Sequence, residues 1–169
     1  MSLPSIGAGF PALKAAVLVI ALAVSGAAQA QSSGPFGKIA GSWTGGGNIA
    51  IGQDTNERIR CRADYQVGSA GSTATISLRC ASDSYKFELQ GNVRYQNGEV
   101  LGDWNETTRG TGGRVTGTIK GDKIDVRVDG QSFSALLSLV TKGDKQSISI
   151  RGPVGAQMSE ANITLSRKS

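Results

Sequence analysis

The chain has 169 residues, a formal net charge of +5 and no histidine. Without histidine, Ser-His and Cys-His nucleophilic pairs are excluded and the commonest zinc ligand is missing, so an enzyme would depend on carboxylates, lysine or tyrosine. We therefore expect a protein with no catalytic site, no metal site and no cofactor. Its charge is only mildly basic, and we expect no nucleic-acid partner.

Residues 1–30 have the pattern of a secretory signal peptide. Lys14 precedes a short apolar core, Ala15 to Val24, and Ala28-Gln29-Ala30 is a small-x-small cleavage site. The core is too short to span a bilayer, so we predict a protein that does not span the membrane and that lies in the periplasm or is secreted. Residues 31–40, rich in Ser and Gly, are predicted to be a mobile N-terminal tail ahead of one β-domain over residues 41–169.

From residue 41 onward, apolar and polar residues alternate in short runs between turn residues, which is typical of antiparallel strands with one buried face. Residues 152–160 form the one sizeable loop, which could hold a helical turn. The polar outward face excludes an outer-membrane barrel. The pattern predicts an all-β, single antiparallel up-and-down barrel of eight to ten strands with one disulfide. The expected strands cover residues 42–51, 57–67, 73–81, 85–96, 99–108, 115–120, 123–129, 132–141, 145–151 and 161–167.

The disulfide follows from the expected register of one hairpin. A loop centred at residues 70–71 places Cys61 directly opposite Cys80, both on the inward face. Facing residues of antiparallel strands are close enough for a disulfide, and an even cysteine count in an exported chain favours one. We predict a structural Cys61–Cys80 bridge. A redox-active pair is the weaker alternative, because the chain has no Cys-x-x-Cys motif.

The two ends of the β-domain resemble the calycin barrels, which include lipocalins, avidins and fatty-acid-binding proteins. Gly41-Ser42-Trp43 opens the first strand, and Arg167 and Lys168 stand at the end of the last. The resemblance implies that Arg167, or else Lys168, packs on the face of Trp43 and closes the barrel. The Thr-Asp-Tyr motif of lipocalins is missing from this sequence.

Two further resemblances point in different directions. Residues 78–87 (LRCASDSYKF) and 102–106 (GDWNE) resemble an uncharacterised family of small exported proteins of Gram-negative bacteria. The early Gly-x-Trp and the disulfide are also similar to small periplasmic metalloprotease inhibitors, whose mobile N-terminal tail plugs the protease. That resemblance implies a protease partner for the tail Gln31-Ser32-Ser33-Gly34-Pro35.

The inward face offers candidate ligand-binding residues, namely Trp43, Tyr65, Trp104 and Glu106. An Asn97-Gly98 turn places Glu106 opposite Leu89 on the inward face. A buried carboxylate must be paired, protonated or functional, and Tyr65 is a possible partner across the lumen. Glu106 is therefore a ligand-contacting acid or a structural carboxylate with satisfied hydrogen bonds. The remaining alternative is that the expected register is wrong and that Glu106 does not point inward. The many small inward residues leave a cavity or let the sheet coil tightly, and the sequence does not decide between the two.

The outward face offers a candidate anion-binding row, formed by Arg58, Arg60, Arg62, Arg79, Lys86 and Arg109. The expected hairpins place Arg62 opposite Arg79, Arg79 opposite Lys86, and Lys86 opposite Arg109. Facing like charges are destabilising, so such a row suggests an acidic glycan, lipopolysaccharide, a lipid surface or an acidic protein. The alternative is a solvated face neutralised by Glu57, Asp64 and Glu88.

These patterns favour an exported, non-catalytic binding protein. We expect it to hold a small apolar ligand inside the barrel or an acidic envelope component on its basic face. The alternatives are a periplasmic protease inhibitor acting through its N-terminal tail and an envelope-structural protein.

Overall fold

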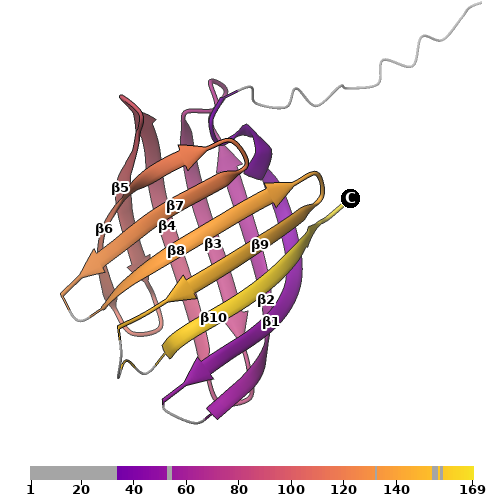
Figure 1. The fold of residues 1–169 in the computed structure, drawn as a ribbon, viewed down its shortest axis with the longest axis vertical. Coiled ribbons are helices and arrows are strands. Elements are labelled where there is room, and N and C mark those ends of the chain that lie inside the picture. The colour runs from indigo at the N-terminus through magenta and orange to yellow at the C-terminus, as the bar shows by residue number, and fades with distance from the viewer. Residues whose placement is uncertain (1–33, 53–54, 132, 154–155, 157) are drawn as a thin grey trace, which may run out of the picture.

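The computed structural model describes residues 34–169 other than 53–54, 132, 154–155 and 157. The predicted signal peptide and residues 31–33 lie outside the described residues. Ten antiparallel strands close into one barrel in which each strand pairs with its neighbours along the chain and β1 pairs with β10, confirming the predicted fold (Figure 1). The elements are η1 (Gly37–Ile39), β1 (Gly41–Ile51), β2 (Thr55–Val67), β3 (Thr73–Ala81), β4 (Lys86–Gln96), β5 (Glu99–Glu106), β6 (Thr111–Lys120), β7 (Lys123–Gly130), β8 (Ser134–Lys142), β9 (Lys145–Arg151) and β10 (Met158–Arg167).

Among the strand boundaries that differ from the expected ones, three differ by two to four residues for a local reason. β5 stops at Glu106, two residues early, because Glu106 begins a hydrogen-bonded turn. β6 begins at Thr111, four residues early, and so includes a glycine-rich stretch that has the composition of a loop. β10 begins at Met158, within the expected loop over 152–160, where the Gly152 N–H donates to the Ser159 carbonyl oxygen and extends the hairpin.

The register of β2 and β3 brings the two cysteines together. Cys61 and Cys80 are direct partners across the two strands, with Cα atoms 4.2 Å apart, and they form the predicted disulfide. Both side chains are buried in the barrel core. The bridge therefore joins neighbouring strands from inside.

The expected register of β3 and β4 is wrong by two residues. Arg79 faces Glu88, and Lys86 faces Ala81. The turn spans four residues from Ser82 to Tyr85, and the Ser82 side chain accepts a hydrogen bond from the Tyr85 N–H. Since Ser and Asp stabilise turns of several lengths, residue types alone did not set the centre of this turn.

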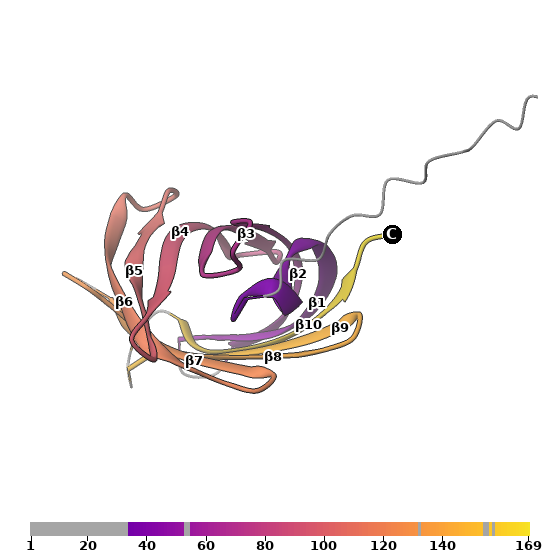
Figure 2. The same ribbon diagram turned by 90° about the horizontal axis from the view of Figure 1, so that it is seen from above.

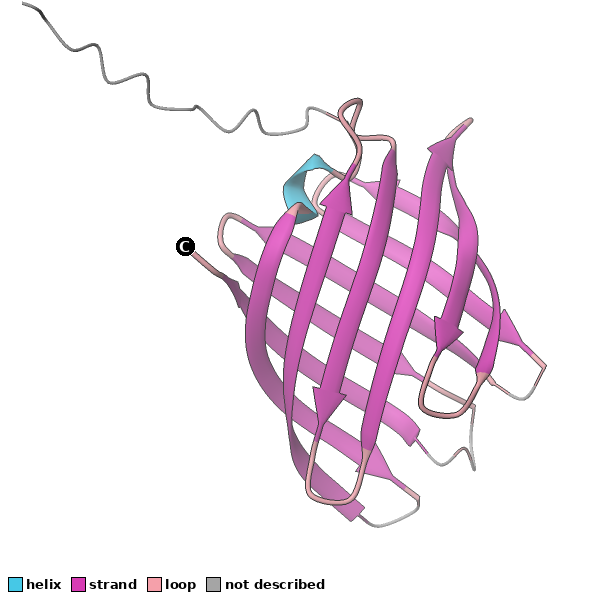
Figure 3. Cartoon of the chain, turned by 180° about the vertical axis from the view of Figure 1, so that it is seen from behind, coloured by secondary structure: helices cyan, strands magenta, loops and turns pink. Residues whose placement is uncertain are grey.

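One end of the barrel is closed by the residues that precede β1. The short helix η1 lies within the outline of the strands when the barrel is seen from above (Figure 2), and Figure 3 shows it at the same end as the C-terminus. Phe36 and Ile39 are buried in the core, and the Phe36 N–H donates to the Gly71 carbonyl oxygen at 2.9 Å. Residues 34–40, expected to belong to a mobile tail, are therefore packed into the barrel end. An apolar pair in a Ser/Gly-rich segment was the signal for this packing.

Candidate functional site

At the closed end, Trp43 and Arg167 form the contact that the calycin resemblance implies. They are cross-strand partners on β1 and β10, and the guanidinium carbon lies 4.2 Å from the centre of the indole ring. Arg167 also donates to the carbonyl oxygens of Ala40 and, at 2.9 Å, of Lys38. Trp43 donates to the Ile39 carbonyl oxygen at 2.8 Å. This cluster ties the η1 segment to the last strand.

At the opposite end, the barrel contains a cavity of about 260 Å³. Its lining includes one described residue from each segment that follows β3, β5, β7 and β9, namely Tyr85, Arg109, Phe133 and Ala156. Tyr85, Arg109 and Thr111 line the mouth, while aromatic and aliphatic side chains line the interior. The principal interior residues are Phe87, Leu89, Trp104, Val128, Phe133 and Ile150. The cavity is thus an apolar chamber with polar groups at its entrance, the usual design of a small-molecule site.

Trp104 forms one wall of this cavity because glycines flank it on both neighbouring strands. It faces Gly91 on β4 and Gly113 on β6. Its indole N–H points to the Asp129 carbonyl oxygen at 3.4 Å, and its ring meets Phe133 edge-on with centroids 5.6 Å apart. The ring also lies close to Gly130 on β7, where a Cβ would be 2.9 Å from Cζ2 of Trp104, so a larger residue at position 130 would clash with it.

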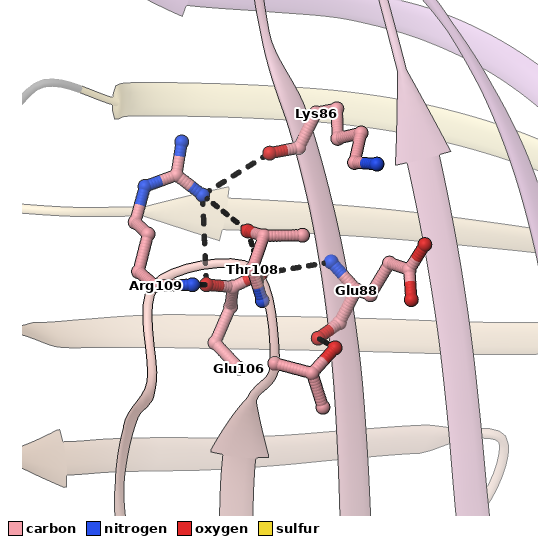
Figure 4. Close-up of polar contacts among 6 residues, drawn as sticks. Lys86, Glu88, Glu106, Thr108 and Arg109 are labelled. Carbon is pink, nitrogen blue, oxygen red and sulfur yellow. Dashed lines mark hydrogen bonds and ion pairs between the residues drawn. The ribbon is translucent and has the colours of Figure 1, made fainter.

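Glu106 lines the cavity, but its carboxylate is engaged by neighbouring donors (Figure 4). Oε1 accepts from the N–H of Glu88 at 2.9 Å, from the N–H of Thr108 at 3.1 Å and from the Thr108 hydroxyl. Oε2 accepts from the Arg109 N–H at 2.8 Å. Burial alone would raise the pKa of this carboxyl, but the hydrogen bonds outweigh burial and lower the pKa. Glu106 is an ionised structural group that closes the turn after β5.

Arg109 stands at the cavity mouth as a consequence of that turn. Its guanidinium lies 4.5 Å from the centre of the Tyr85 ring and 3.6 Å from a Glu106 oxygen. Nη1 also donates to the Lys86 carbonyl oxygen at 3.1 Å and to the Thr108 hydroxyl at 3.0 Å (Figure 4). Arg109 therefore connects β4 to the turn after β5 and presents positive charge at the entrance.

Tyr65 does not reach Glu106. Its hydroxyl donates to Gln146 Oε1 at 2.9 Å, and the Gln146 amide donates to the Thr141 hydroxyl at 3.2 Å. Burial raises the pKa of the Tyr65 phenol strongly. Tyr65 belongs to the lining of a deeper chamber of about 100 Å³ between the first cavity and the η1 segment. The two chambers adjoin each other, since both are lined by Leu89, Trp104, Val128, Leu137 and Ile150.

The four predicted ligand-binding residues therefore have different positions. Trp104 and Glu106 line the cavity at the open end, and Tyr65 lines the deeper chamber. Trp43 is fully buried at the closed end and lines neither chamber. The Arg167 guanidinium covers its ring, and its indole N–H donates to the Ile39 carbonyl oxygen. Sequence reasoning did not include Phe133 among the ligand-binding residues, and it assigned Arg109 to the outer anion-binding row and not to the cavity. The position of Phe133 just before β8 was the available signal.

The predicted anion-binding residues form a different pattern from the expected row. Arg58, Arg60 and Arg62 are exposed on β2, and Arg62 faces Arg79 as expected. The row does not continue to Lys86 and Arg109, because Arg79 faces Glu88 and Arg109 has no partner in the β4–β5 register. Lys86 remains on the same wall, since Ala81 separates it from Arg60 across β3.

Two negative observations concern the described residues. None of the helical segments in residues 34–169, apart from the gaps given above, has the length and hydropathy needed to cross a membrane. In the same described part of the chain, no group of three or more His, Cys, Asp or Glu side chains is placed to hold a metal ion.

Comparisons with known proteins show relationships of fold. No protein-family model and no curated protein matches the sequence. The crystal structure of Rv2717c from M. tuberculosis is similar with a TM-score of 0.62 at 18% identity, covering 78% of this chain and 94% of that protein. An S-type phycobiliprotein lyase, CPES from Guillardia theta, has a TM-score of 0.55 at 14% identity, covering 79% of this chain and 90% of the lyase. The ten-stranded barrel and these neighbours fit a calycin-like fold.

Proposed function

We propose that this protein is an exported binding protein that holds a small, largely apolar ligand in the cavity beside Trp104. The observation that carries this proposal is the 260 Å³ chamber itself, with aromatic walls and with Arg109 and Tyr85 at its mouth. A closed barrel with a fully packed interior would have no such space. Sequestering an apolar molecule from water supplies the binding free energy.

The size of the chamber limits the ligand. A dry protein cavity of about 150 Å³ accommodates benzene. A chamber of 260 Å³ therefore suits a ligand with roughly ten carbon atoms. Among the described residues, the Tyr85 hydroxyl makes no hydrogen bond, so it is available to a polar group of the ligand at the entrance.

The state of Glu106 favours binding over catalysis. Its two oxygens already accept hydrogen bonds from the turn after β5 and from β4, and its pKa is lowered. A general acid or base needs a carboxyl with a raised pKa and a free position facing the substrate. One structural neighbour is a phycobiliprotein lyase. In this chain, however, the carboxylate of Glu106 is used in hydrogen bonds to the backbone of the turn after β5.

The remaining functional alternatives have less support from the structure. The tail expected to inhibit a protease, Gln31 to Pro35, lies mostly outside the described residues, and the residues that follow it, Phe36 and Ile39, are buried in the barrel. An envelope-structural role gives no reason for an internal cavity. Export is part of the proposal because the expected signal peptide precedes a disulfide-bonded domain, and disulfides persist in oxidising compartments.

Native mass spectrometry of the protein purified from its own host tests the proposal. We expect an added mass that is lost on unfolding. Ala135 lines the cavity, and Ala135→Phe should fill the chamber and remove the added mass. Ala50 stands on the outer wall beside β10, so Ala50→Phe adds the same bulk outside the barrel and should leave the added mass unchanged.

A second measurement separates cavity binding from surface adhesion. Naphthalene has about the expected ligand size, and we expect it to change the emission of the wild-type protein through Trp104. Trp104→Phe should abolish the change. The remaining tryptophan, Trp43, is fully buried at the closed end, and its emission should not respond to naphthalene. Equal responses from wild type and Ala135→Phe would contradict the proposed cavity function.

A further inference from the structure

Four exposed cations gather on the outer wall formed by β2, β3 and β4. Arg60 and Arg62 project from β2, Arg79 from β3 and Lys86 from β4. Within the described residues, none of these four side chains makes an ion pair or a hydrogen bond. We call these four residues the basic wall. The strands hold these charges together, and the one described acidic side chain that borders them, Glu88, faces Arg79 without forming an ion pair.

The basic wall lines a shallow concavity of about 560 Å³. The rest of the lining is small or polar and consists of Thr44, Gly45, Cys61, Cys80, Ala81 and Glu88. The hollow is on the outside of the barrel and is separate from the chamber beside Trp104, since the two share no lining residue. Any partner bound there is additional to the ligand in the cavity.

Repulsion among these cations lowers the stability of the folded protein, and an anionic partner would remove this repulsion. Arg62 lies directly opposite Arg79, and facing like charges on neighbouring strands are destabilising. A carboxylate placed between two guanidinium groups offsets this repulsion and accepts charge-assisted, bidentate hydrogen bonds. Alternate residues of a strand are about 7 Å apart and neighbouring strands about 5 Å apart, so the wall presents cations at repeated short intervals.

We propose that the basic wall binds a linear acidic polysaccharide whose carboxylates occupy the positions between these cations. A chain with repeated carboxylates is complementary in charge to this cluster of three guanidinium groups and one ammonium group. A lipid surface would also bury apolar side chains, but the one exposed large apolar side chain among the described residues, Leu136, lies on β8, outside the hollow. No aromatic side chain lines the hollow, so it lacks the stacking surface typical of single-stranded nucleic-acid sites.

The test uses polygalacturonate oligomers as the probe, with the mature full-length protein at low ionic strength. We expect binding by isothermal titration calorimetry that weakens as salt is added, because screening acts on exposed charges. Methyl-esterified oligomers, which lack the carboxylates, should not bind. Arg62→Glu should weaken binding about tenfold or more, because it reverses one cation and gives Arg79 an internal partner.

The matched control is Lys142→Glu. Lys142 faces Lys145 across the β8–β9 turn, so the substitution makes the same change of net charge and also creates a facing pair of opposite charges. It should leave polygalacturonate binding unchanged, and the melting temperatures of both variants should confirm that they are folded. Equal affinities of wild type and Arg62→Glu would overturn the proposal. Tighter, Arg62-dependent binding to phosphatidylglycerol vesicles or to single-stranded DNA would also overturn the assignment of a polysaccharide.

Discussion

Arg167, near the end of the chain, lies over the indole of Trp43 on the first strand, with 4.2 Å between the guanidinium carbon and the ring centre. The contact joins β10 to β1 at the position where the barrel closes. The same guanidinium donates to the backbone of residues 38 and 40, which precede β1. One side chain therefore holds the barrel seam and the segment that plugs the closed end.

Removing the Arg167 side chain should destabilise both the β1–β10 seam and the segment that precedes β1. We expect Arg167→Ala to lower the free energy of unfolding by about 2–3 kcal/mol, because a cation–π contact and charge-assisted hydrogen bonds are lost together. Arg167→Lys keeps the charge but loses the planar fork, so it should cost less. Urea denaturation measures both values. Equal stability of Arg167→Ala and wild type would show that the seam does not depend on this contact.

The Cys61–Cys80 disulfide closes a short loop and should contribute to stability without being needed for the fold. Its sequence separation is 19 residues, for which restriction of the unfolded chain predicts about 3 kcal/mol. We expect dithiothreitol to lower the urea midpoint of the wild type while the far-UV circular dichroism of the folded state is retained. The double variant Cys61→Ala/Cys80→Ala should not respond to dithiothreitol, and a response would assign the effect to something else.

Glu106 should make the stability of the barrel depend on pH. The pKa of Glu106 is lowered from its usual 4.5 in the folded state, so its stabilising contribution is complete above that value and is lost as the pH falls through the folded pKa. We expect Glu106→Gln to cost about 1–3 kcal/mol at neutral pH, because buried donors lose an ionised acceptor. The variant should also lose less stability than wild type on further acidification below pH 4.5.

Urea denaturation at a series of pH values measures this difference. Glu160→Gln is a suitable control, because Glu160 is exposed on β10 and accepts a hydrogen bond from the Asn162 side-chain amide. Parallel pH curves for wild type and Glu106→Gln would contradict the role of this carboxylate.

The two glycines that face Trp104 should differ in their tolerance of a methyl group. A Cβ on Gly91 would lie 3.4 Å from the Asp103 carbonyl oxygen, an ordinary contact. A Cβ on Gly113 would collide with the Asp129 carbonyl oxygen and would lie 2.7 Å from Cα of Gly130. We expect Gly91→Ala to change stability by less than about 0.5 kcal/mol and Gly113→Ala to cost about 2 kcal/mol or more.

Thermal unfolding of the two alanine variants gives the comparison directly. Trp104 emission should also shift in Gly113→Ala, because the β6–β7 backbone beneath the ring has to move. A larger loss of stability in Gly91→Ala than in Gly113→Ala would contradict the described packing around Trp104.

The sequence was informative wherever a feature depends on local chain geometry. Alternation of polar and apolar residues predicted the strands, and the short loops after β2 and β4 set the registers that pair Cys61 with Cys80 and Gly91 with Trp104. These features follow from turn length and from the two-residue repeat of a strand. Where a turn is built from Ser and Asp, as after β3, residue types allow several lengths, and the register of Arg79 was wrong.

The sequence by itself therefore determined the all-β class, the closed barrel, the hairpins with short turns and the disulfide of this protein. Only the tertiary structure decided that Phe36 packs into one end of the barrel, that Glu106 is held by its own turn, and that a chamber remains beside Trp104. The physical reason is that cavity volume and end packing depend on the twist of all ten strands and on the combined bulk of every inward side chain. No short stretch of sequence contains that information.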